Sequence, residues 1–333
     1  MKLSIKLLLL IIVSFVCLLA GKANAEPWVV FEGKEGPGMG KHVVFLVGDE
    51  EYRSEDSMPQ LAKILAVHHG FKCTVLFAIN KQTGEIDPQT LDNIPGLEAL
   101  QTADLMVMFL RFRELPDDQM KYIIDYTNSG KPIIGLRTST HAFFYREHKD
   151  SPYAKYSFQS KEPRGGYGRQ VFGETWINHY GHHQKESTRG LLVKGMGNES
   201  IATGIDDIWG PSDVYGLTTL AGDCKPLVMG QVLSGMNPKD KPNPDKKLVP
   251  VAWTKTYTGE EGKTARVFTT TMGHSFDFFS EGFRRLLVNA CCWAMAMEDK
   301  IPAKSKVDFV GEYKPNKIGM GKHKRGLKPS DHK

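Results

Sequence analysis

Three histidines lie within five residues of one another, in a stretch with the mixed polar, aromatic and glycine composition of a loop. They are His179, His182 and His183, and Trp176 and Tyr180 lie beside them in the sequence. Imidazoles bind divalent metals and exchange protons near neutral pH, and aromatic rings offer apolar faces on which a sugar ring can pack. The stretch therefore predicts a sugar-binding site or a metal site. Loop histidines that only hydrogen-bond to backbone remain an equal alternative.

Other chemically capable side chains come directly after short apolar runs. They are Glu51 and Tyr52 after the run 42–48, Arg111 after 104–110, Arg137 after 132–136 with His141 four residues on, and His274 after 265–271. Carboxylates and imidazoles at such positions can act as general acids or bases, and arginine can orient anions or hydroxyl groups. Non-catalytic alternatives remain open: Arg137 could pair with a structural carboxylate, and the acids after the run 42–48 could be solvated charges that precede a helix.

From these two groups we predict the site residues and their roles. The catalytic candidates are His274, His182, Glu51 and Arg137, with His274 as the main acid or base; the substrate-binding candidates are Tyr52, Arg111, His141, Trp176, Tyr180 and His183. A divalent metal is an open alternative, with His179, His182 and His183 as its candidate ligands. No HExxH or CxxC spacing supports a metal motif, and no cofactor is firmly indicated.

The elements that must position these residues alternate between strands and helices. Continuously apolar runs at 42–48, 73–79, 104–110 and 132–136 predict buried strands, and helical spacing predicts helices at 54–70 and 117–128. Strands that are apolar on both faces and alternate with helices are typical of a parallel sheet covered on both sides. Ligands bind at the carboxyl edge of such sheets, where the polar residues would gather.

The second half of the chain is less regular. We expect a polar insertion at 145–185, strand-like segments at 226–233, 249–256 and 265–271, and a last helix at about 280–297. Residues 26–40 are rich in glycine and predict an extended lead-in to the main domain. Residues from 302 onward show no periodicity, so 299–333 is expected to be a basic extension that is loosely packed or docked.

Four stretches resemble the ThuA-like family, named for trehalose utilisation. They are Val47–Tyr52, Pro132–Gly135 with the following turn, Thr271–His274, and the run Asn289-Ala290-Cys291-Cys292-Trp293-Ala294. The resemblance covers about residues 41–298. It implies an α/β fold of three layers with a mainly parallel central sheet. This architecture is flavodoxin-like and is shared with the class I glutamine amidotransferase-like proteins. Glutamine amidotransferases carry a nucleophilic cysteine in the turn after the fourth strand, and Arg137 stands there in this chain, so amidotransferase activity is not expected.

The resemblance also implies a role in carbohydrate metabolism. It suggests a hydrolase, lyase or isomerase that acts on a modified, for example keto, disaccharide or glycoside. Two alternatives stay open: a non-catalytic sugar-binding protein, and a partner subunit of an exported sugar-oxidation system. The expected partner is a small-molecule carbohydrate, and self-association into a homo-oligomer is left open.

The first 25 residues predict export. Residues 7–20 are apolar, follow Lys2 and Lys6, and precede Ala23-Asn24-Ala25. A basic start, a short apolar core and an Ala-x-Ala site are typical of a secretory signal peptide, so we expect cleavage after Ala25, a periplasmic or secreted protein, and no stable membrane span afterwards.

The net charge of +5 belongs to the two ends of the chain. Residues 302–333 hold nine Lys or Arg against three acidic residues, and residues 1–25 hold three lysines and no acid, so the body between them is net negative. A nucleic-acid-binding domain needs a basic folded face. We therefore expect no nucleic-acid partner.

Overall fold

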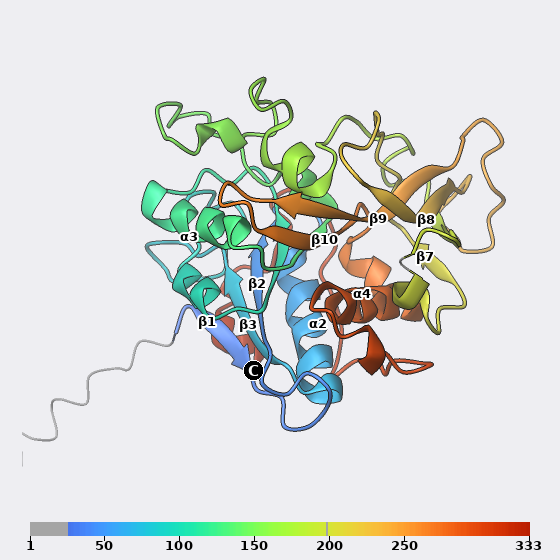
Figure 1. The fold of residues 1–333 in the computed structure, drawn as a ribbon, viewed down its shortest axis with the longest axis horizontal. Coiled ribbons are helices and arrows are strands. Elements are labelled where there is room, and N and C mark those ends of the chain that lie inside the picture. The colour runs from blue at the N-terminus through green and yellow to red at the C-terminus, as the bar shows by residue number, and fades with distance from the viewer. Residues whose placement is uncertain (1–25, 198) are drawn as a thin grey trace, which may run out of the picture.

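The computed structural model describes residues 26–197 and 199–333, so the expected signal peptide lies outside the described residues. Within that part, ten strands form one sheet in the order β1-β3-β2-β4-β5-β10-β9-β8-β6-β7 (Figure 1). The chain is thus an α/β protein built on a single large sheet.

The predicted apolar runs form the parallel half of the sheet. The strands are β2 (His42–Gly48), β3 (Lys72–Phe77), β4 (Leu105–Leu110) and β5 (Ile133–Leu136). Neighbours pair in parallel, with Phe45 opposite Val75 on one side and Val107 on the other. Side chains of these strands are buried on both faces, which explains why the runs are apolar throughout rather than alternating.

The remaining strands make the sheet mixed. They are β1 (Trp28–Phe31), β6 (Thr188–Leu192), β7 (Ile208–Gly210), β8 (Lys225–Val232), β9 (Val249–Thr258) and β10 (Thr264–Thr270). β10 pairs in parallel with β5, whereas the pairings of β1 with β3, β10 with β9, β9 with β8, β8 with β6 and β6 with β7 are antiparallel.

The expectation of a mainly parallel sheet is therefore wrong. A parallel connection needs a crossover of a dozen or more residues, usually a helix, and the described residues between β6 and β10 form no such helix. The clearest case is the link from β9 to β10, a tight turn in which Gly259 N–H donates to Lys263 O at 2.9 Å. A turn this short can join only antiparallel neighbours.

Helices cover both faces of the sheet. The α-helices are α2 (Ser54–His69), α3 (Asp117–Asn128) and α4 (Glu281–Ala294). α2 and α4 pack in one hydrophobic cluster and α3 in a second cluster across the sheet, as Figure 1 shows. Gly70 ends α2 in the left-handed conformation at φ 80°, and the Ser280 hydroxyl caps α4 by accepting from Phe283 N–H.

Eight short helical turns complete the described elements. They are η1 (Leu97–Gln101), η2 (Arg137–His141), η3 (Ala154–Tyr156), η4 (Gly168–Phe172), η5 (Glu199–Ala202), η6 (Ser275–Phe279), η7 (Glu298–Lys300) and η8 (Pro329–His332). Two of them, η2 and η6, start directly after sheet strands or their end loops and bear on the site below.

Both ends of the described chain are part of the fold. The expected lead-in contains β1, which adds an antiparallel edge to β3. The C-terminal extension crosses α2, where His69 bonds to Lys306 O at 2.7 Å, and ends with His332 stacked on Phe77 (5.3 Å between ring centroids). Figure 1 places the C-terminus beside β1. Of the two alternatives for this extension, docking is the one observed.

A search of the described helices for a membrane span finds none with the necessary length and apolar character. The cysteines Cys73, Cys224, Cys291 and Cys292 are all free thiols.

Candidate functional site

Polar loops gather at the carboxyl ends of the parallel strands β2, β4, β5 and β10. Because these strands run in the same direction, the segments that follow Gly48, Leu110, Leu136 and Thr270 meet at one edge of the sheet. These are the segments in which the sequence places Glu51, Arg111, Arg137, His141 and His274. The predicted catalytic edge is therefore assembled by the parallel half of the sheet.

A second pair of loops, 176–183 and 211–216, lies against this edge. Tyr180 N–H donates to Val214 O and Gly216 N–H donates to Asn178 O, both at 2.9 Å. This backbone pairing holds His179 and His183 next to Asp213. The histidine-rich insertion thus reaches the strand-end residues through a loop that follows β7.

Asp213 is the centre of the cluster. Its Oδ1 accepts from Arg137 Nη2 at 2.7 Å and lies 3.0 Å from His183 Nδ1, while its Oδ2 lies 2.6 Å from His179 Nδ1. The carboxylate is buried, and although burial acts to raise its pKa, Arg137 and the two histidines hold that pKa well below its usual range. Asp213 is accordingly an ionised, buried acceptor for three donors.

Arg137 is fully buried at the point where β5 turns into η2. It also donates to the backbone oxygens of Thr271 (2.8 Å) and Asp213 (3.1 Å), and its guanidinium lies 4.1 and 4.3 Å from the ring centres of Tyr52 and Tyr215. Its backbone is left-handed, with φ 41°, which marks a tight strand-to-helix turn. Every contact of this side chain is internal, so Arg137 acts as a structural tie between loops.

His183 joins Asp213 to Glu51. Its Nε2 lies 3.2 Å from Glu51 Oε1, and Arg111 Nη1 lies 3.2 Å from Glu51 Oε2. Hydrogen bonds to Asp213 and then Glu51 raise the pKa of His183 to about 9. Burial acts to raise the pKa of Glu51, but His183 and Arg111 outweigh it, so that pKa lies below its ordinary value. A chain of alternating charges therefore runs across the site.

His274 is held in one tautomer. Its Nδ1 accepts from Phe276 N–H at 2.9 Å, and only an unprotonated nitrogen can accept, so the proton of the neutral ring sits on Nε2. Burial, together with the positive charges of Arg137 and His183, lowers the pKa of His274 to about 3. Nε2 has no hydrogen-bond partner within the described chain and is not among its fully buried polar atoms. His274 thus presents a free N–H donor.

Tyr52 lies between the two histidines. Its ring centre is 5.9 Å from that of His183 and 6.1 Å from that of His274. Three buried hydroxyl oxygens in the neighbouring loops have no hydrogen-bond partner in the described part of the chain, namely Ser212 Oγ, Thr271 Oγ1 and Ser275 Oγ. Buried polar groups are nearly always satisfied, so unpaired atoms at one place indicate where a polar ligand or water binds.

The other expected residues are placed at different distances from this cluster. The ring centre of the buried His141 lies 5.6 Å from that of Trp176, and the ring centre of Trp176 lies 5.9 Å from that of His179. These three rings therefore pack in a row next to the cluster. Tyr180 bonds instead to Lys247 N–H and lies under Lys246.

The exposed His182 stands apart, since its ring makes no contact with the cluster among the residues that the structure describes.

Three acidic residues that were not among the predicted site residues organise the site. Asp213 was overlooked because it stands in a short turn, 76 residues beyond Arg137, with no spacing that distinguishes it from other acids. Asp49 accepts from the backbone of Glu51 and Tyr52 and from the Thr138 hydroxyl. Asp277 accepts from the backbone N–H groups of Gly273 and Ser212 and so joins two of the loops. Their common signal is an acid one to six residues beyond a strand end or glycine.

One group of side chains could hold a metal ion. His179, His183 and Asp213 offer ligand atoms that all lie within 4.8 Å of one another. His182, the third candidate from the sequence, is not part of this group. The chemistry of the set is developed below.

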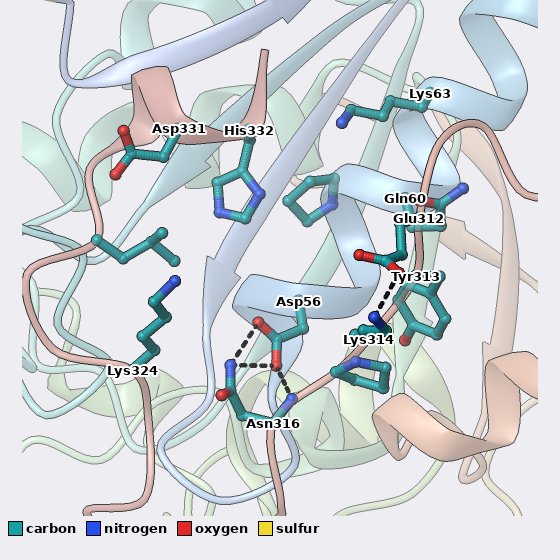
Figure 2. Close-up of a pocket in the computed structure, with 13 residues that line it drawn as sticks. Asp56, Gln60, Lys63, Glu312, Tyr313, Lys314, Asn316, Lys324, Asp331 and His332 are labelled. Atoms are coloured by element: carbon teal, nitrogen blue, oxygen red, sulfur yellow. Dashed lines mark hydrogen bonds and ion pairs between the residues drawn. The ribbon is translucent and has the colours of Figure 1, made fainter.

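A separate cavity of about 430 Å³ lies between α2 and the C-terminal extension. Figure 2 shows its walls, where Asp56 bonds to Asn316 and Glu312 pairs with Lys314. None of the residues that the sequence singled out for chemistry lines it. The edge around Asp213 is therefore the stronger candidate site.

Comparisons with known proteins find two similar solved structures and one matching family model. The structure is similar to ThuA-like proteins from Parabacteroides merdae (14% identity, 81% of this chain and 94% of that chain, TM-score 0.48) and Bacteroides uniformis (13%, 79% and 94%, TM-score 0.46). A search of curated proteins finds no match. The family model described as ThuA, trehalose utilisation, matches residues 42–294. These residues include the whole cluster around Asp213, and the chain belongs to the ThuA family.

Proposed function

We propose that this protein is an exported carbohydrate-active enzyme that removes a proton next to the carbonyl group of a keto sugar. The family description, trehalose utilisation, supports a carbohydrate-related role. The finer assignment rests on the site around Asp213, where a neutral donor, a carboxylate and aromatic rings are gathered. An isomerase or a lyase would use such a site, since both reactions begin with the same proton abstraction.

The observation that carries this proposal is the fixed tautomer of His274. A neutral imidazole whose Nδ1 is occupied by Phe276 N–H carries its proton on Nε2, and this N–H can donate to a carbonyl oxygen and stabilise the negative charge that develops there. It is a poor general base, because Phe276 N–H already occupies Nδ1. The role that we assign to His274 is therefore that of a donor to the substrate oxygen, in place of the acid or base expected from the sequence.

Glu51 is the proposed proton acceptor. Its carboxylate takes the proton from the carbon beside the carbonyl, and the bonding electrons move into an enolate whose oxygen accepts from His274 Nε2–H. Return of the proton to the neighbouring carbon after enediol formation gives an isomer. Loss of an oxygen substituent from the carbon one further along, with a proton supplied to that oxygen, gives elimination and cleaves a glycosidic bond.

The remaining side chains would bind the sugar. Arg111, which contacts Glu51, can donate to hydroxyl groups, and the half-buried ring of Trp176 offers an apolar face for the sugar ring, supported from behind by the buried His141.

The test is proton exchange in deuterated water. Residues 26–333 are incubated with a panel of disaccharides and their keto derivatives and followed by proton NMR. We expect loss of the signal from the proton beside the carbonyl, or new product signals, with one keto sugar. H274Q should slow this at least about 100-fold, the usual cost of losing one such donor, and H182A should leave it unchanged.

Two other outcomes would overturn the proposal. Line broadening of a sugar with no exchange or product would indicate the non-catalytic sugar-binding protein. No effect with any sugar would favour the partner subunit of an exported oxidation system.

A further inference from the structure

We propose that the protein binds one divalent transition-metal ion between His179, His183 and Asp213. This inference goes beyond the proposed function, because it concerns metal binding in the absence of any sugar. It rests on the type of the three side chains, the distances between their ligand atoms, the groups that support them, and the access of solvent.

The three side chains are a ligand set that transition metals favour. Two imidazole nitrogens and one carboxylate bind Zn²⁺, Co²⁺, Mn²⁺ or Fe²⁺ and leave other coordination positions open. Purely oxygen-liganded ions such as Ca²⁺ and Mg²⁺ use carboxylates and carbonyls instead. The donor atoms therefore point to a transition metal.

The distances are close to those around a bound ion. With bonds of about 2.0–2.2 Å, neighbouring ligand atoms lie about 3–3.5 Å apart. His183 Nδ1 is 3.0 Å from Asp213 Oδ1, His179 Nδ1 is 2.6 Å from Asp213 Oδ2, and the three ligand atoms all lie within 4.8 Å. Small rotations of the two histidine rings would bring them into range, and the ion would replace the protons that these contacts now share.

A supporting carboxylate is already in place. Glu51 Oε1 lies 3.2 Å from His183 Nε2 and holds a proton there, so Nδ1 can bind the metal once the ion replaces the proton that Nδ1 now shares with Asp213. Carboxylate–histidine–metal arrangements of this kind are usual around metal-binding histidines. Arg137 plays the corresponding part for Asp213, because its Nη2 bonds to Oδ1 and orients the carboxylate.

The set is also open on one side. The Asp213 side chain is 1% exposed, whereas the side chains of His179 and His183 are 34% and 25% exposed. Asp213 would thus bind the ion from the buried side, and the ion would remain in contact with solvent beside the two histidines.

The experiment measures metal binding directly. Tag-free residues 26–333 are stripped with a chelator and titrated with Zn²⁺ by calorimetry and with Co²⁺ by visible absorption, in the absence of sugar. We expect one ion per chain, with cobalt bands of a low-symmetry nitrogen and oxygen site. H179A and H183A should each weaken binding at least tenfold.

The matched control is H182A. His182 is a neighbouring histidine of the same loop, it is exposed, and it makes no contact with the set among the described residues. Its removal should change neither stoichiometry nor affinity. The His179 side chain is 34% exposed and the Asp213 side chain only 1%, so H179A tests the site even if changes at Asp213 prevent folding.

Two results would overturn the metal site: no stoichiometric binding to the parent chain, or equal affinity in the parent, H179A and H183A. Either result would leave the keto-sugar proposal standing, because proton exchange with a sugar can be measured separately on the chelator-stripped chain. Conversely, metal binding with no exchange on any sugar would support the site and refute the proposed reaction.

Discussion

Replacing Asp213 by Asn tests whether the buried charge at the centre of the cluster holds the fold together. The substitution keeps the size of the side chain and one acceptor oxygen, but it removes the negative charge that faces Arg137. Both side chains are essentially buried, at 1% and 0% exposure, and Arg137 Nη2 lies 2.7 Å from Asp213 Oδ1. Asp213→Asn therefore leaves a buried guanidinium without its counter-charge.

The size of the effect follows from this burial. Breaking a buried ion pair by removing one partner costs about 3–5 kcal/mol. Asn still accepts one hydrogen bond, and Arg137 keeps its bonds to the backbone oxygens of Thr271 and Asp213. We therefore expect the lower end, a decrease of about 3 kcal/mol in the free energy of unfolding.

The assay is urea unfolding of residues 26–333, followed by circular dichroism at constant pH. Asp207→Asn is the matched control, because Asp207 pairs with Arg189 at 2.8 Å on the surface, where its side chain is 56% exposed. Exposed pairs contribute about 0–1 kcal/mol, so the control should unfold close to the parent chain. If D213N unfolds within about 1 kcal/mol of D207N, the reasoning that the Arg137 charge depends on Asp213 is refuted.

Three further predictions concern pH, the extension and export. Burial raises the pKa of Glu55 to about 8, against an opposing effect of Arg53, so the folded state keeps a proton that the unfolded chain loses above its ordinary pKa of 4.5. The free energy of unfolding should therefore fall by up to about 1.4 kcal/mol per pH unit between pH 5 and 8. Urea titrations at several pH values should show a flatter slope for E55Q. Asn316→Ala removes the two contacts of the Asn316 side-chain amide with the Asp56 carboxylate and leaves the backbone N–H bond in place. It should cost about 1.5–3 kcal/mol and expose the extension to limited proteolysis; unchanged cleavage would contradict its docking. Expression of the full chain in a secreting bacterial host should yield a mature protein that begins at Glu26, and an intact mass that retains residues 1–25 would rule out the signal peptide.

The elements of the parallel half could be predicted from the sequence because their signal is local. The apolar run at 42–48 coincides with β2, and the helical pattern at 117–128 coincides with α3. β1, β6 and β7 were missed because they are short and only partly buried, so their residues carry no continuous apolar run. Strand direction was wrong for the second half, since it depends on connections and pairing partners rather than on the composition of a strand.

The candidate site shows the same division. The sequence by itself determined that Glu51, Arg137 and His274 follow strands, and parallel strands end at one edge, so their approach to each other follows from chain order. It could not determine which of three loop histidines faces that edge: backbone pairing of 178–181 with 214–216 turns His179 and His183 toward Asp213 and leaves His182 outside.

Only the tertiary structure decided the protonation states and hydrogen-bond partners of the site residues. Asp213 becomes the centre of the cluster because folding buries it against Arg137, 76 residues away in the chain. His274 becomes a donor because the first turn of η6 brings Phe276 N–H to its Nδ1. Charge, tautomer and hydrogen bonding depend on burial and on neighbours distant in sequence, whereas strand and helix patterns depend on adjacent residues, and this is why the former emerge only with the fold.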